Sequence, residues 1–220
     1  PGFLVNRILM PYLMEAVGLF ANGADVADID NAMLDFGMPM GPLRLLDEVG
    51  LDVARHVAGT LSNHFKDRMI VPAMIDRMVE GDLLGRKSKE RHGFYRHYLE
   101  TPQPNDGVKA FQYGDSAADL TIECLQRRMV LPMINEAARC LEEEVVQAPE
   151  DIDFAMVMGT GFAPFRGGPL RYADSLGMDL VLRELLHEVE GGARHFEPCG
   201  LLRRKWTDSE TFYPRNGGTS

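Results

Sequence analysis

The sequence predicts an all-α protein made of two helical domains in tandem. Apolar residues recur at helical spacing along most of the chain, and the alternating β-branched runs typical of strands are absent. The order of motifs in the first half returns in the second half, which is the sign of an internal repeat. With 220 residues, 45% of them hydrophobic and 25% charged, the chain can bury one large core or two smaller ones.

Five helices are predicted in the first half, separated by Gly and Pro. They are expected at residues 3–20, from Asp25 or Asp28 to Gly37, and at 43–49, 52–65 and 71–79. Pro11 lies inside the first of them and is expected to kink or restart it. The helical period is lost from 85 to 98, and Pro and Gly residues interrupt the stretch that follows. We therefore expect a first domain at 1–100, a linker at 101–119 and a second domain at 120–220.

The second half repeats the first in order, with an offset that grows from 121 to 127 residues. The matched elements are Arg7, Pro11 and Glu15 with Arg128, Pro132 and Glu136; Asp28-Ile-Asp30 with Asp151-Ile-Asp153; Gly41-Pro-Leu-Arg44 with Gly168-Pro-Leu-Arg171; and Asp47 with Asp174. Pro42 and Pro169 are each expected in the first turn of a helix, where the missing N–H of proline costs little. Glu15 and Glu136 are each expected on a solvent face or as the partner of the repeated Arg.

Charge and cysteine content exclude several classes of function. A net charge of -10 and a pI near 5.1 argue against a nucleic-acid partner. Three widely spaced cysteines predict reduced thiols and a cytoplasmic protein. No apolar run approaches the roughly 20 residues that span a bilayer, so no membrane span is expected. His, Cys and acidic residues show no metal-ligand spacing, and we expect no metal site.

Ready-made catalytic motifs are scarce, and two features remain as candidates. Gly159-Thr-Gly161 continues to Pro164 and follows no strand, so it is interpreted as a loop and not as a dinucleotide fingerprint. Asn6, the one uncharged polar residue between Phe3 and Met10, either caps a helix or donates a hydrogen bond to a substrate oxygen. The basic run Arg86 to His92 is either a solvated loop or a contact for an anionic group such as a phosphate.

Motifs along nearly the whole chain resemble those of one family. Residues 1–9, PGFLVNRIL, and 37–43, GMPMGPL, resemble the start of the C-terminal domain of 3-hydroxyacyl-CoA dehydrogenases. Residues 135–143, NEAARCLEE, and 159–172, GTGFAPFRGGPLRY, are similar to the second copy of that domain in multifunctional fatty-acid oxidation enzymes. Because the short monofunctional enzymes carry one copy, the duplication points to the α-subunit type of the multifunctional complex.

The resemblance implies an NAD-dependent oxidation of 3-hydroxyacyl-CoA to 3-ketoacyl-CoA in β-oxidation. In this family a Rossmann domain, joined before the segment that matches Pro1-Gly2, binds NAD and carries the catalytic His and its Glu partner. This chain would then hold no catalytic and no cofactor-binding residue, and would be inactive alone. Its abrupt start also predicts missing upstream residues. The implied partners are an acyl-CoA substrate, upstream Rossmann and enoyl-CoA hydratase domains, and a thiolase subunit.

Within the resemblance, Asn6 matches the Asn that contacts the substrate oxygen, which favours its role as a polarising donor. Met158 stands where the family often has an aromatic residue that contacts substrate, so it is the second predicted substrate-binding residue. The loop at 85–95 is longer than in the family. The second-copy position that corresponds to Asn6 is Arg127, so the duplication did not repeat the site. Two alternatives stay open: a helical assembly module, and the helical domain of a dehydrogenase for a non-CoA hydroxy acid.

Overall fold

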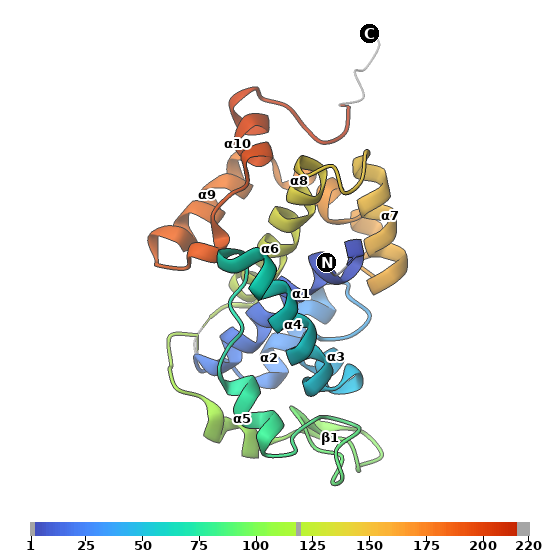
Figure 1. The fold of residues 1–220 in the computed structure, drawn as a ribbon, viewed down its shortest axis with the longest axis vertical. Helices are drawn as coiled ribbons and strands as arrows, with labels where there is room; N and C mark the ends of the chain where they lie inside the picture. The colour runs from blue at the N-terminus through green and yellow to red at the C-terminus, as the bar shows by residue number, and fades with distance from the viewer. Residues whose placement is uncertain (1–2, 118–119, 215–220) are drawn as a thin grey trace. The chain divides into compact units, whose positions relative to one another are not determined.

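The computed structural model describes residues 3–117 and 120–214, and within them the regular secondary structure is helical apart from two two-residue strands. The α-helices are α1 (Phe3–Ala21), α2 (Val26–Phe36), α3 (Pro42–Val49), α4 (Leu51–Phe65), α5 (Met74–Glu80), α6 (Ile122–Glu142), α7 (Pro149–Thr160), α8 (Pro169–Leu176), α9 (Met178–Glu190) and α10 (Gly200–Thr207) (Figure 1). Short 3-10 helices are η1 (Lys66–Arg68), η2 (Asp106–Phe111), η3 (Pro164–Arg166) and η4 (Arg194–Phe196). The all-α prediction is confirmed.

The chain divides into two compact units, and the division falls inside the two longest helices. Unit 1 consists of the described residues of Met10–Met129. Unit 2 consists of Phe3–Leu9 and the described residues from Val130 onward. Each of α1 and α6 therefore contributes its first turns to one unit and the rest of its length to the other. The expected repeats at 1–100 and 120–220 concern the duplicated sequence, and they stay a prediction.

Several helix ends follow the predicted turn chemistry. α3 begins at Pro42 after Gly41, and α8 begins at Pro169 after Gly168, as the repeated motif predicts. α2 ends at Gly37, which has the left-handed φ of 108° that favours glycine. α1 runs unbroken through Pro11, so the helix is not restarted there.

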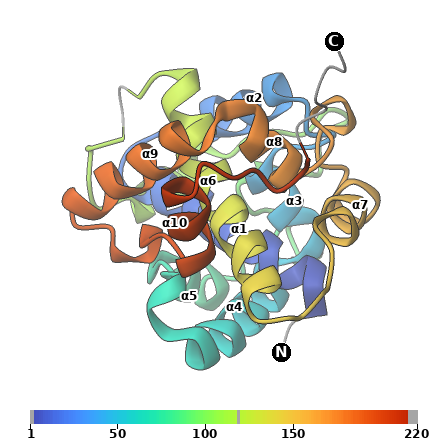
Figure 2. The ribbon, with the colours of Figure 1, turned by 90° about the horizontal axis from the view of Figure 1, so that it is seen from above.

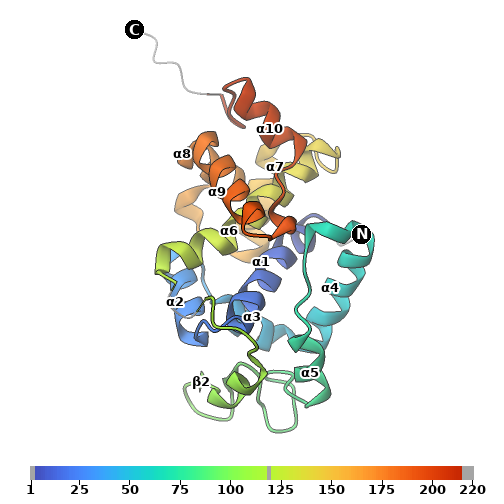
Figure 3. The same ribbon diagram turned by 90° about the vertical axis from the view of Figure 1, so that its left-hand side faces the viewer.

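The structure contains two short strands that were not predicted. β1 (Tyr95–Arg96) and β2 (Gln103–Pro104) pair in antiparallel register with Tyr95 opposite Pro104 (Figure 3). Strands of two residues are too short to leave an alternating pattern. The linker expected at 101–119 stays a prediction, and its last two residues lie outside the described part of the chain. Residues 101–117 pack within unit 1: Val108 is buried in η2, and the Tyr113 N–H donates to the Ala21 carbonyl at 2.9 Å. Backbone hydrogen bonds hold this segment, and they need no apolar periodicity.

Each unit has its own apolar core. In unit 1, Phe20 and Phe94 meet edge to face with ring centres 5.4 Å apart. In unit 2, α7, α8 and α9 follow one another from right to left in Figure 2, and α10 lies beside α9. Phe162 and Phe196 are fully buried there. Buried methionines contribute to both cores, where their flexible side chains fill gaps.

The prediction that no apolar run is long enough to span a bilayer is wrong for α1. Leu4–Ala21 is long and apolar enough to cross a membrane by length and composition, with a mean hydropathy of 1.3. However, 72% of this window is buried within the protein, which is typical of a core helix. It also contains Arg7 and Glu15, both buried and both ion-paired.

Candidate functional site

Two ion pairs, one buried and one partly buried, explain the repeated Arg and Glu of α1 and α6. In unit 2, Arg7 Nε donates to Glu136 Oε1 at 2.6 Å, and only 5% and 2% of these residues are exposed. In unit 1, Arg128 donates from Nε and Nη2 to Glu15 Oε1 at 2.9 and 2.6 Å. Neither Glu therefore lies on a solvent face, and each pairs with the Arg of the other copy. Buried charges need such partners because desolvation is costly.

Unit 1 is also held by a buried carboxylate that caps α3. Asp30 accepts hydrogen bonds from the N–H groups of Leu43 and Arg44 at 2.8 and 3.0 Å, and from the Tyr95 hydroxyl at 2.7 Å. Gly41 allows this close approach, because a Cβ there would lie 2.5 Å from Asp30 Oδ1. Burial raises the pKa of Asp30 to about 6, although the three donors act in the opposite direction.

Unit 2 repeats this arrangement with its own residues. Asp153 accepts from the N–H groups of Leu170 and Arg171 at 2.8 and 2.9 Å, and from the Tyr213 hydroxyl at 2.7 Å. Gly168, at φ 111°, leaves room for that carboxylate. Burial raises the pKa of Asp153 as well. The two carboxylates are thus structural, and the duplication extends to a Tyr near the end of each repeat.

In each repeat a second carboxylate accepts hydrogen bonds from the backbone N–H groups of this tyrosine and of the phenylalanine before it. Asp47 accepts from the N–H groups of Phe94 and Tyr95 at 3.0 and 2.8 Å, and His97 Nε2 lies 2.7 Å from its Oδ2. Asp174 accepts from the N–H groups of the matching Phe-Tyr pair, residues 212–213, at 2.9 Å each. Because both oxygens of each Asp are used in this way, neither is placed to act as a general base.

Asn6, the predicted substrate contact, lies inside α1 in unit 2 and is exposed, whereas the next two residues are buried. It does not cap the helix, since α1 begins at Phe3. Within the described residues its side chain makes no hydrogen bond, so its amide is available to another molecule.

Met158, the second predicted contact, is on α7 and is 70% exposed. The two helices touch beside these residues, because a Cβ on Gly159 would lie 3.2 Å from Val5 Cγ2. Asn6 follows Val5 in the sequence and Met158 precedes Gly159, so both residues lie at this junction of α1 and α7. Phe154, one turn before Met158, is 68% exposed and extends the apolar surface.

The basic run of unit 1 pairs with local carboxylates. Arg86 donates to Glu48 at 3.0 Å and Lys87 forms an ion pair with Asp52. Ser88 is buried, and its hydroxyl accepts from the His92 N–H at 2.7 Å. This geometry favours a solvated structural loop, and contact with an anion stays a prediction.

The glycine motif, the possible metal ligands and the cysteines provide no further candidate site. Gly159 and Gly161 lie at the C-terminal end of α7, whereas phosphates bind at helix N-termini. This motif therefore offers no cradle for the pyrophosphate of a dinucleotide. The described residues contain no group of three or more His, Cys, Asp or Glu that could hold a metal ion. Within the described residues, no disulfide involves the cysteines at 124, 140 and 199.

The fold and these repeated contacts define a duplicated helical domain. The sequence model of the 3-hydroxyacyl-CoA dehydrogenase C-terminal domain matches residues 2–97 and again 125–212. This chain therefore belongs to that family.

Similar proteins extend this assignment. The chain is 36% identical over 219 residues to the fatty acid oxidation complex subunit alpha of Idiomarina loihiensis and, equally, to that of Shewanella sp. strain MR-4. The alignment covers 96% of this chain but 30% of each relative, so the chain spans less than a third of their length.

Solved structures share the fold. The crystal structure of 3-hydroxybutyryl-CoA dehydrogenase from Escherichia coli K12 has a TM-score of 0.75 and 25% identity, covering 93% of this chain and 59% of that one. The dehydrogenase part of multifunctional enzyme 1 from C. elegans has a TM-score of 0.66 and 21% identity, with coverage of 90% and 46%.

Proposed function

We propose that this chain is the substrate-pocket and packing part of an NAD-dependent 3-hydroxyacyl-CoA dehydrogenase of fatty-acid β-oxidation. The parent would be a cytoplasmic multifunctional enzyme that also carries enoyl-CoA hydratase activity and associates with a thiolase subunit. The family membership and the two fatty acid oxidation complex relatives support this proposal.

Asn6 is the observation that carries the substrate role. Its amide is exposed although the next two residues are buried, and it makes no hydrogen bond within the described residues. As an N–H donor it can polarise the oxygen at C3 of the substrate, where charge changes during oxidation. Met158 and Phe154 supply apolar surface at the same junction, suited to an acyl chain.

NAD is assigned to an upstream domain. The glycine motif on α7 does not fit a dinucleotide, because it lies at the C-terminal end of its helix and phosphates bind at helix N-termini. We expect the purified chain to produce no NADH from 3-hydroxybutyryl-CoA and NAD, measured by the absorbance of NADH. NADH formation above that of a heat-denatured sample would contradict the proposal.

The substrate role is tested by Asn6→Ala in the full-length parent. We expect kcat for 3-hydroxybutyryl-CoA to fall by about 100-fold, as on removal of a donor to a developing charge. The Tm should stay within about 2 °C because Asn6 is exposed. Arg127→Ala is the matched control, since it changes the corresponding position of α6.

The same experiment separates the alternatives. Unchanged turnover of Asn6→Ala would refute the substrate role and leave the assembly module, for which the exposed Phe154 and Met158 would form the contact surface. Gel filtration of both variants reports assembly separately from turnover. Faster oxidation of free 3-hydroxybutyrate than of its CoA ester by the parent would favour the non-CoA dehydrogenase.

A further inference from the structure

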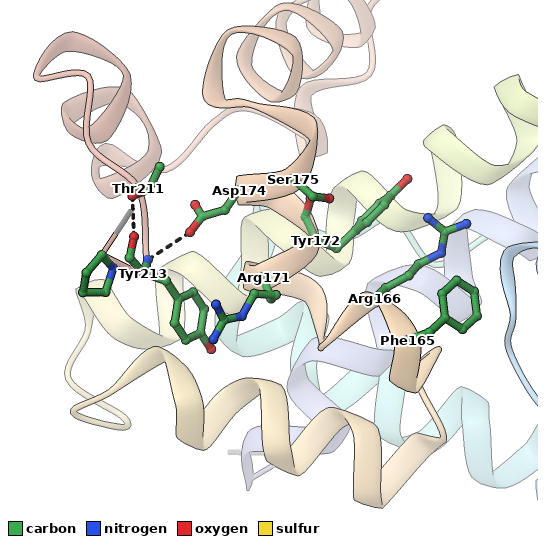
Figure 4. A pocket seen from close by; sticks show the side chains of 9 residues that line it. Phe165, Arg166, Arg171, Tyr172, Asp174, Ser175, Thr211 and Tyr213 are labelled. Atoms are coloured by element: carbon green, nitrogen blue, oxygen red, sulfur yellow. Dashed lines mark hydrogen bonds between the residues drawn. The ribbon is translucent and has the colours of Figure 1, made fainter. Parts of the chain in front are cut away.

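Unit 2 contains a pocket of about 510 Å³ beside α8, and Asp174 and Tyr213 are among the residues that line it (Figure 4). Its wall is formed by η3, α8 and the segment 211–214. Two arginines line it, Arg166 and Arg171, together with the rings of Phe165, Tyr172 and Tyr213. Because its residues come from three separate segments, the pocket leaves no continuous motif in the sequence.

Both guanidinium groups are held against aromatic rings. The Arg171 guanidinium lies 3.6 Å from the centre of the Tyr213 ring. Arg166 reaches between Phe165 and Tyr172, at 5.1 and 4.8 Å from their ring centres. Stacking of this kind fixes the plane of an arginine, and at Arg171 it leaves the edge N–H groups able to donate.

The first repeat provides an internal comparison for Arg171. Its counterpart Arg44 donates from Nε and Nη2 to Glu48 at 3.1 and 2.9 Å. In the second repeat the position of Glu48 is occupied by Ser175, which is exposed and donates to the Tyr172 carbonyl instead. Across the described part of unit 2, no carboxylate accepts a hydrogen bond from the Arg171 guanidinium. The second repeat therefore has the arginine but lacks the carboxylate that binds it in the first repeat.

The nearby carboxylates do not replace that partner. Asp174 lines the pocket, but its two oxygens accept from the N–H groups of Phe212 and Tyr213. Asp153 attracts Arg171 electrostatically, and it already accepts three hydrogen bonds from other groups. Because the first copy has a matching pair of carboxylates as well as Glu48, the second copy is the more positive of the two at this place.

We propose that this pocket binds a nucleotide, in which a ribose joins a phosphate ester to a planar base. Planar guanidinium groups such as those of Arg166 and Arg171 match phosphate oxygens through paired N–H donors. A volume of about 510 Å³ exceeds what inorganic phosphate needs and lies in the range of small-molecule sites. The exposed ring of Phe165 offers a surface on which a base can stack. The ligand can be a free nucleotide or the nucleotide end of coenzyme A.

Calorimetric titration of the 220-residue chain at low ionic strength tests this site without any dehydrogenase activity. The probes are ADP, coenzyme A and inorganic phosphate. We expect ADP and coenzyme A to bind once per chain, and phosphate to bind more weakly. Equal affinities of ADP and coenzyme A would identify the nucleotide itself as the ligand, and tighter binding of coenzyme A would identify its nucleotide end.

Three variants locate the site. Arg171→Gln removes the donor, and Ser175→Glu restores the spacing of the first repeat, so each should weaken ADP binding about tenfold or more. Arg44→Gln is the matched control in unit 1 and should leave binding unchanged. Circular dichroism confirms folding, and the exposed position of Ser175 keeps that variant informative if Arg171→Gln unfolds. Absence of binding to the wild type, or equal binding by all variants, would overturn the proposal.

Discussion

Replacing Gly41 by Ala tests whether the Asp30 carboxylate organises unit 1. The added Cβ would lie 2.5 Å from Asp30 Oδ1 and closer still to two carbons of that side chain. These atoms belong to a buried side chain on α2, so they cannot swing into solvent. Either the start of α3 moves away or Asp30 leaves its donors.

The magnitude follows from those two costs. Forcing extra volume into a packed site costs about 1–3 kcal/mol. Weakening a hydrogen bond to a charged group costs about 1.5–3 kcal/mol, and Asp30 accepts three such bonds. We expect Gly41→Ala to lower the free energy of unfolding at pH 7 by about 3–5 kcal/mol. In a protein of this size that corresponds to a fall in Tm on the order of 10 °C.

Differential scanning calorimetry measures the shift, and Gly59→Ala provides the control. Gly59 lies inside α4, and a Cβ added there would have no atom within 4 Å, so alanine should stabilise the helix by about 0.5–1 kcal/mol. A Tm for Gly41→Ala within about 2 °C of the wild type would refute the reasoning, because it would mean that Asp30 and α3 are not in close contact.

Two further predictions concern buried ionisable groups. Arg7→Met leaves Glu136 with a weaker partner in unit 2, and urea unfolding should show a loss of about 3 kcal/mol; a loss below about 1 kcal/mol would argue against a tight pair. Burial raises the pKa of Asp30 to about 6, so the folded protein binds the proton of this carboxyl more tightly than the unfolded chain does. The resulting contribution to the free energy of unfolding is fully present below about pH 4. That contribution is lost as the pH rises through 6 and amounts to about 3 kcal/mol. Carbon NMR of the Asp30 carboxyl should show a titration midpoint near 6, and a midpoint at the ordinary aspartate value of about 3.9 would contradict the effect of burial.

Local signals in the sequence predicted much of the fold. Pro42 and Pro169 mark helix starts and Gly37 marks a helix end, because these effects depend on one residue and its neighbours. The partner of Arg7 could not be predicted in this way, since Glu136 is 129 residues away. Repetition showed that both residues recur but not that they pair across the copies.

The candidate site was predictable to a similar extent. A resemblance to a family singled out Asn6 and Met158, and the structure places both in exposed positions at one helix junction. The pocket at Arg171 has only a weak signal in the sequence, which is Ser175 at the position that matches Glu48. This difference could be interpreted only after the structure had shown that Glu48 pairs with Arg44.

The sharing of α1 and α6 between the units has a consequence for splitting the gene. If one product ended at residue 117 and the other began at residue 120, Arg7 would be separated from Glu136, and Glu15 from Arg128. Each product would then carry the few helical turns that complete the unit of the other, and would expose apolar surface in their absence. Such halves should be poorly soluble apart and recover their structure when co-expressed, so this chain is suited to fragment complementation.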